Sequence, residues 1–231
     1  MSARKLAKTA YRALLIAFFA LVIAHVALDL GHPVWWDFAP LVLAYAVLIV
    51  ANRWGGAPDS ARAARAPVEV EPPVTGRWIA LNSPADHTPS HHTHAYGQTF
   101  AIDVVAEPEP GSRPPFRALW PVARRNADFP AHGAPLHAVA DATVVRATDT
   151  ARDHLRRGSL TVREGDRVHP GQVLAQVGNS GNSTEPHLHF QLMDGPDPDT
   201  ARGIPFTWRA IGVPRNNEVF EVPARPVGAR A

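Results

Sequence analysis

Two histidines separated by one residue stand in a short apolar run near the end of the chain. Residues 186–192 read PHLHFQL, so His187 and His189 alternate with apolar side chains. A short run with this alternation predicts a β-strand. Side chains two positions apart on a strand point to the same face, so the two imidazoles should lie side by side. Such a pair can share a metal ion, or one imidazole can bind it while the other transfers protons. Two half-exposed histidines without a function are the alternative.

A second group of histidines precedes a carboxylate in another strand-like run. His91, His92 and His94 come shortly before Asp103. An unpaired carboxylate is costly to bury in a strand, and a histidine from the preceding loop could fold back beside it. One of these histidines, Asp103 and His189 would together give three nitrogen and oxygen ligands. A fourth position would stay open for water, which is the composition of a catalytic zinc site. The chain has no cysteine, so thiolate zinc sites and disulfides are excluded.

Short strands must position these residues. After residue 76, short apolar runs are separated by Gly, Pro and Asn, and no segment of useful length has the helical period; the runs are residues 77–81, 99–105, 136–145, 159–162, 173–177 and 187–192. This pattern predicts an all-β domain, a compact sandwich or barrel-like fold. The tail, residues 194–231, is rich in Pro and Gly, and its aromatic patch at Phe206 and Trp208 could pack back on the domain.

The beginning of the chain is different in character and predicts a two-helix transmembrane hairpin within residues 1–54. Its helices should cover about residues 13–30 and 34–51. Each apolar run alone is shorter than the ~20 residues of a perpendicular span, but with flanking residues both just reach across a bilayer. Trp35 and Trp36 fit an interfacial belt. A buried soluble hairpin, or a cleaved signal peptide for the first run, are the alternatives.

Composition and charge divide the rest of the chain and limit its partners. Residues 55–75 are rich in Pro, Ala and charge and predict a linker, followed by a domain at 76–193 and an extension at 194–231. The formal net charge is +2, and no basic stripe interleaved with aromatics occurs, which argues against nucleic acid. Lys and Arg flank the hairpin and are missing from its connection, so the charge bias favours cytoplasmic ends, although a long C-terminal domain can be translocated despite it.

Four stretches of the chain follow one another in an order that is specific in combination. They are residues 90–103 (SHHTHAYGQTFAID), 134–145 (APLHAVADATVV), 163–174 (REGDRVHPGQVL) and 178–190 (GNSGNSTEPHLHF). Together they resemble the M23 (lysostaphin-like) zinc metallopeptidases, over roughly residues 76–193. The resemblance implies a compact all-β fold, one Zn²⁺ ion, and peptides of bacterial peptidoglycan as substrates.

The same resemblance implies roles for individual residues. Asp103 and His189 match the family's zinc ligands, and His187 matches the histidine that assists catalysis. His91 is the best match to the remaining ligand, with His94 as the alternative. His154 matches a second catalytic histidine, but the strands that precede it in the family are missing, so the central segment is shortened.

We therefore expect a membrane-tethered zinc metalloendopeptidase that acts on peptidoglycan peptides and contacts the lipid bilayer through residues 13–51. We place it at the cell membrane with the peptidase domain outside the cytoplasm. The alternative is a catalytically degenerate M23-like domain that binds cell wall or regulates a partner hydrolase, which the shortened segment favours. Retention of Asp103, His187 and His189 argues against this alternative, because buried polar groups are costly to keep.

Overall fold

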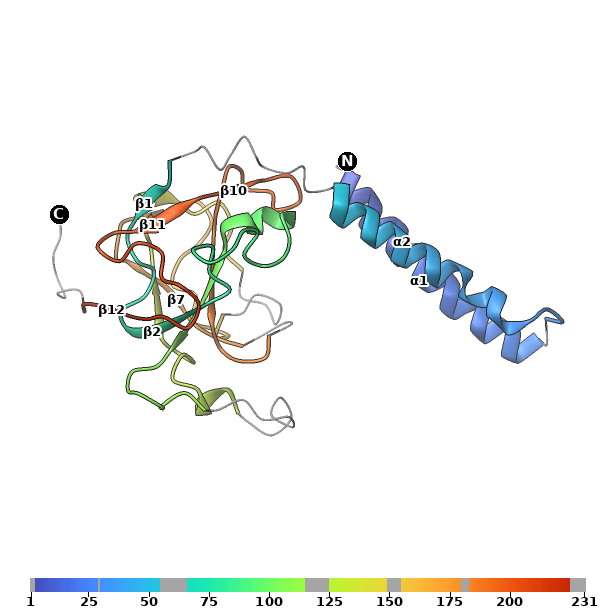
Figure 1. Cartoon of the computed structure of the whole chain (residues 1–231), viewed down its shortest axis with the longest axis horizontal. Helices are drawn as coiled ribbons and strands as arrows, with labels where there is room; N and C mark the ends of the chain where they lie inside the picture. Colours follow the sequence, from blue (N-terminus) through green and yellow to red (C-terminus); the bar gives the residue numbers. More distant parts are fainter. Residues whose placement is uncertain are drawn as a thin grey trace.

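A computed structural model of the chain describes residues 3–28, 30–54, 66–114, 125–148, 155–179 and 183–224. It shows a helical hairpin at the beginning of the chain and a body of short strands formed by described residues from 68 onward (Figure 1). The hairpin contacts the body near the first turns of its first helix. Lys8 Nζ lies 2.6 Å from Asp199 Oδ1 and 4.7 Å from the centre of the Tyr96 ring.

The hairpin consists of α1 (Ala3–Leu28), the short 3₁₀ helix η1 (Val34–Phe38) and α2 (Ala39–Trp54). The first helix begins about ten residues before the predicted start at residue 13. Residues 3–12 are mostly Ala, Lys, Arg and Leu, which are strong helix formers, so the helix extends beyond its apolar part. By length and composition, Leu6–Leu28 and Val34–Ala51 could each cross a membrane.

The largest sheet of the body brings together segments from the middle and the end of the chain. Its order is β12 (Val219–Val222), β2 (Gly76–Leu81), β3 (Ile102–Ala106) and β8 (Leu188–Phe190), and all neighbours are antiparallel. Strand β3 is central and buried along its whole length. Its β-branched residues, Ile102, Val104 and Val105, suit such a position because they pack well on both faces of a pleated sheet.

Within the described residues, four two-stranded sheets accompany the largest sheet. They pair β1 (Val68–Val70) with β11 (Phe206–Trp208), β9 (Leu192–Met193) with β10 (Gly203–Ile204), β4 (Pro135–His137) with β7 (Val173–Gln176), and β5 (Ala142–Thr143) with β6 (Arg167–Val168). The 3₁₀ helices η2 (Ala95–Phe100) and η3 (Asn126–Asp128) lie between strands. The predicted all-β character is confirmed. Among the described strands no sheet closes into a barrel, and a sandwich stays a prediction.

Among the described residues, one expected strand is shorter than predicted and another is absent. Residues 99 and 100 belong to η2, since Tyr96 and Gly97 have positive φ angles of 60° and 71° and turn the chain before β3 begins. Residues 159–162 form no strand, although Thr161 donates to the carbonyls of Leu174 and Val173. Residues 138–141 likewise interrupt the long run that we expected from 136 to 145.

Aromatic side chains from the end of the chain fill the core beneath the largest sheet. The ring of Phe190 lies 4.9 Å from Phe206 and 5.7 Å from Trp208, whose ring is in turn 5.5 Å from Phe220. The expectation that the aromatic patch packs back on the domain is confirmed. Strand β1 comes from the predicted linker, and strands β10, β11 and β12 come from the predicted extension; all four are paired within the sheets of the body. The domain limits at residues 76 and 193 stay predictions.

Candidate active site

Two neighbouring strands and one loop bring three predicted ligands together. Asp103 on β3 pairs directly with His189 on β8 in the antiparallel register. Paired residues point to the same face of a sheet with their side chains in contact, so this register alone sets two of the three. His91 comes from the loop before η2 and reaches the same carboxylate from the other side.

The three side chains form a compact group around the Asp103 carboxylate. His91 Nε2 lies 3.0 Å from Oδ2, and His189 Nδ1 lies 2.9 Å from Oδ1. One nitrogen of each histidine and one carboxylate oxygen all lie within 4.8 Å of one another. Two imidazoles and a carboxylate that converge in this way fit the ligand set of a zinc ion with an open fourth position.

Asp103 is only 8% exposed, so its charge depends on these neighbours. Burial by itself would raise the pKa of this carboxyl group. In the metal-free protein, with a proton on the nitrogens that face it, hydrogen bonds from His189 and His91, and one from Asn82 Nδ2 at 2.8 Å, outweigh burial and hold the pKa of Asp103 far below its ordinary value. Burial lowers the pKa of His189, but the bond to Asp103 and the charge of that carboxylate raise it overall. The pair therefore keeps an ionised carboxylate in place.

A buried serine fixes which nitrogen of His91 faces the group. The Ser90 hydroxyl donates to the Ala101 carbonyl at 2.6 Å, which uses its only hydrogen. At 3.2 Å from His91 Nδ1 it can then only accept, so Nδ1 carries the proton and Nε2 directs a lone pair at the group. Metal-binding histidines are commonly oriented through their second ring nitrogen in this way.

Gln191 fixes which ring nitrogen of His189 faces Asp103. The Gln191 amide nitrogen donates to the Tyr96 carbonyl at 2.9 Å, so its oxygen is the atom that lies 3.0 Å from His189 Nε2. That oxygen accepts a proton from Nε2 and leaves the lone pair of His189 on Nδ1, the nitrogen beside Asp103. When both imidazoles are neutral, as metal binding requires, the two histidines of the group therefore present an unprotonated nitrogen to the same space.

His187 lies at the edge of the group and differs from its two histidines. Its Nε2 is 3.8 Å from Asp103 Oδ1, and its Nδ1 is 2.9 Å from the Glu185 carbonyl. A proton on Nδ1 donates to that carbonyl, so Nε2 is the nitrogen that can exchange protons on the open side. Arg113 binds both carboxylate oxygens of Glu185 and thereby fixes the turn that precedes β8.

The other predicted residues have different surroundings. His94 Nδ1 lies 3.1 Å from the Thr99 hydroxyl and outside the three-residue group, and the ring of His92 stacks on His87 at 5.2 Å. The predicted catalytic residue His154 lies outside the described residues. The assignment of these roles stays a prediction.

Sequence reasoning missed two polar residues that support the group, Asn82 and Gln191. Gln191 had a signal, because it follows His189 by two positions and so shares its side of the chain. Asn82 had none, since it reaches Asp103 only through the pairing of β2 with β3. Sequence reasoning also missed the cluster of His25, His32 and Asp37 in the hairpin.

Comparisons with known proteins agree with this picture. Residues 150–200 match the family model described as peptidase family M23, a stretch that contains His187 and His189 but neither Asp103 nor His91. The glycyl-glycine endopeptidase ALE-1 of Staphylococcus capitis is 35% identical over 78 residues, which cover 26% of this chain and 22% of that relative. No solved structure matches the chain significantly. The resemblance to the M23 peptidases is therefore confirmed over the matched region.

The alignment also bears on the length of the aligned region in the two proteins. It extends over 78 positions, whereas 26% of a 231-residue chain is about 60 residues, so this chain is shorter than the relative within the aligned region. The chain spans about a fifth of the length of the relative that it matches.

Proposed function

We propose that the protein is a membrane-tethered zinc metalloendopeptidase that cleaves peptide bonds in bacterial peptidoglycan. The group of His91, Asp103 and His189 carries this proposal, because the hydrogen bonds of Ser90 and Gln191 leave both imidazoles with a lone pair directed at one space. The named activity of the relative, cleavage between glycines, supports peptides of the cell wall as the substrate class.

In this proposal His91, Asp103 and His189 would hold zinc, which would supply polarisation of the scissile carbonyl and activation of water. The remaining steps belong to the chain. His187 accepts a proton on Nε2 during attack and returns it to the leaving amine, which is general acid–base catalysis. The Glu185 carbonyl, on the other ring nitrogen, stabilises the imidazolium that forms. Asp103 stays ionised throughout because its pKa is so low.

Exposed apolar surface on the hairpin supports the tether. Ile16, Val26 and Val42 are each at least 68% exposed. The buried share is 0% in the first candidate span and 11% in the second. Surface of this kind is unfavourable in water and suits a lipid environment. The ion pair of Lys8 with Asp199 and its contact with Tyr96 would hold the η2 side of the site close to the membrane.

The tether is tested by extracting membranes from cells that express the full chain. We expect the protein to remain with the membranes after high-salt and alkaline washing, because a spanning hairpin is released only by detergent. Release by alkali would show that the hairpin does not span. A reporter fused after Ala231 then reports the side, and an extracytoplasmic domain is the result that fits a cell-wall substrate.

The activity is tested by incubating the detergent-purified full chain with purified sacculi and measuring newly formed amino termini. Wild type should release them, and His189→Ala should not. A wild-type protein that binds zinc at this group and is folded but inert on several kinds of cross-bridge would contradict the enzymatic proposal. The shorter aligned region favours the second candidate in that event, a degenerate domain that binds cell wall or regulates a partner hydrolase.

A further inference from the structure

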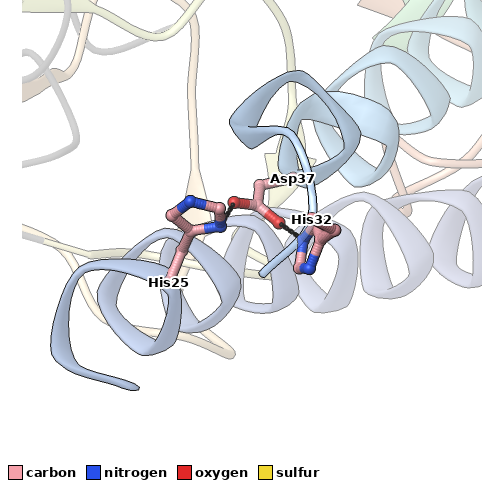
Figure 2. Close-up of side chains that lie close together, drawn as sticks. All are labelled: His25, His32 and Asp37. Atoms are coloured by element: carbon pink, nitrogen blue, oxygen red, sulfur yellow. Dashed lines mark hydrogen bonds and ion pairs between the residues drawn. The ribbon is translucent and has the colours of Figure 1, made fainter. Parts of the chain in front are cut away.

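Two histidines and a carboxylate also meet at the closed end of the helical hairpin. His25 belongs to the last turn of α1, His32 to the connection, and Asp37 to η1. The connection folds the chain back at this point, and Figure 2 shows the two imidazoles on either side of the Asp37 carboxylate. None of these residues belongs to the site around Asp103.

Each carboxylate oxygen of Asp37 faces one imidazole nitrogen. His25 Nδ1 lies 2.9 Å from Oδ2, and His32 Nε2 lies 2.7 Å from Oδ1. The two rings meet edge to face with their centres 5.0 Å apart. The three candidate ligand atoms lie within 4.8 Å of one another, as they do in the group around Asp103.

Burial makes this arrangement expensive without a further partner. Asp37 is 1% exposed. His25 Nδ1 and Asp37 Oδ2 are both shielded from solvent, and neither has a hydrogen-bond partner among the described residues, although they are 2.9 Å apart. Buried polar atoms are nearly always satisfied, because an unsatisfied one costs about 1–3 kcal/mol. A cation between these two atoms would satisfy both.

The second ring nitrogen of His32 indicates which state of the imidazole fits. His32 Nδ1 lies 3.3 Å from the Leu30 carbonyl, so a proton on Nδ1 can donate to it. A backbone carbonyl in this position is a common partner of metal-binding histidines. The lone pair of Nε2 then points at Asp37 Oδ1, and two lone pairs 2.7 Å apart need a proton or a metal ion between them.

We propose that His25, His32 and Asp37 bind a divalent transition metal ion of the zinc class, separate from the ion expected at Asp103. Two imidazoles and one carboxylate are the nitrogen and oxygen ligands that such ions prefer. The ion would join the last turn of α1 to η1 and so fix the end of the hairpin. Gly31, with a φ of 63°, and Pro33, with a φ of −61°, already shape the connection for this contact.

The test uses the full chain in detergent, stripped with a chelator, reloaded with Zn²⁺ and freed of excess metal. Wild type should retain about two zinc ions per chain, one for each three-ligand group. Asp37→Asn and His32→Gln should each retain about one, and so should His189→Ala. The combination of His32→Gln with His189→Ala should retain almost none. His32→Gln is the safer variant for folding, because its side chain is 37% exposed.

His169→Gln is the matched control. His169 Nδ1 also lies 2.6 Å from a carboxylate oxygen, that of Asp141, but this pair is exposed and belongs to neither three-ligand group in the described structure. The His169→Gln variant should therefore still retain two zinc ions. A second readout is thermal unfolding of the helices by circular dichroism, where Zn²⁺ should raise the Tm of His189→Ala but not of the double variant, because a ligand stabilises the state that binds it.

The zinc counts separate this proposal from the proposed function. One ion retained by His189→Ala and lost when His32→Gln is added supports the hairpin site, whatever the protein does to peptidoglycan. No zinc on His189→Ala, or an unchanged count in both Asp37→Asn and His32→Gln, overturns it. The cluster would then be a hydrogen-bonded group without metal, in which the positive charge of a protonated histidine neutralises the Asp37 carboxylate.

Discussion

Asp103 and His189 are direct partners in the antiparallel pairing of β3 with β8, and His189 Nδ1 lies 2.9 Å from Asp103 Oδ1. Two ligands of the candidate zinc group therefore depend only on strand register. A slip of one residue would move one of the two side chains to the opposite face. The third ligand has no such support, and the loop that presents it relies on the buried hydroxyl of Ser90.

The first prediction concerns which histidine of that loop binds zinc. His91→Ala should lower the zinc content of the full chain by about one ion, because it removes one of three ligands. His94→Ala should leave it unchanged, since His94 is bonded to Thr99 outside the group. Elemental analysis after removal of excess zinc measures both. Equal losses in the two variants would show that the first ligand is assigned wrongly.

A second prediction tests the residues that orient the two histidines. Ser90→Ala and Gln191→Ala should each weaken zinc binding about 10–100-fold, as is typical when such partners are removed. Competition with a chelator of known affinity gives the dissociation constants. Ser112→Ala is a matched control, because its hydroxyl also donates to a backbone carbonyl at 2.6 Å but on an exposed turn. Unchanged affinity in both test variants would mean that the ring orientations do not depend on them.

Local patterns in the sequence predicted much of this site. Alternation predicted a strand through His187 and His189, and β8 contains His189 while His187 lies just before it. The resemblance to a family singled out Asp103 and His91. Asn82 could not be predicted, because its contact with Asp103, 21 residues further along the chain, depends on the pairing of β2 with β3. Such a contact is decided by packing of the whole sheet, and one-dimensional periodicity contains no information about it.

The hairpin gives a second example of a contact that the sequence could not predict. The apolar runs predicted two helices, but not that His25 and Asp37 would meet, since that contact depends on the turn between them. Similarly, the strand expected at residues 159–162 has suitable side chains, yet its backbone joins β7 only at Thr161. Tertiary pairing overrides local propensity at such positions.

The third prediction follows from the pKa shifts of the central pair in metal-free protein. Asp103, with a lowered pKa, stabilises the fold above its ordinary value of 3.8, and this contribution is lost as the pH falls. His189, with a raised pKa, stabilises the fold below its ordinary value of 6.5, and this contribution is lost as the pH rises. With chelator present, the Tm should therefore be highest between about pH 4 and 6.5.

Zinc should reverse the upper part of that profile. The metal must displace the proton of His189, so its affinity increases about tenfold per pH unit below the raised pKa. Melting curves with and without Zn²⁺ should diverge as the pH rises. In His189→Gln the metal-free Tm should lose its decline above pH 6.5, and a decline that persists in this variant would assign it to another group.

A fourth prediction concerns Gly178, a buried glycine between β7 and β8. A Cβ on this residue would lie 2.3 Å from the Leu155 carbonyl carbon and 2.4 Å from Arg156 N, both backbone atoms that cannot rotate away. Gly178→Ala should lower the free energy of unfolding by about 1–3 kcal/mol, as overpacking typically does. In Gly195→Ala the new Cβ meets only the Ala201 side chain at 3.8 Å, so this control should unfold like wild type.

The last prediction separates the two candidate catalytic histidines. His187 Nε2 lies beside Asp103 but is not a member of the three-ligand group, so His187→Ala should keep its zinc. A positioned general acid–base contributes about 10²–10⁴-fold, so cleavage of sacculus peptides should fall by that factor. His154→Ala should cost less, because the segment before it is shortened. Amino-terminus release and zinc content are measured on the same samples.

The combination of the two readouts decides the roles. Zinc retained with activity lost assigns proton transfer to His187, whereas zinc lost from His187→Ala would make it a ligand and exchange its role with that of His189. A larger loss in His154→Ala than in His187→Ala would mean that the shortened segment still delivers His154 to the scissile bond. In that case the preserved Nδ1 contact of His187 with the Glu185 carbonyl serves the turn before β8 and not the reaction.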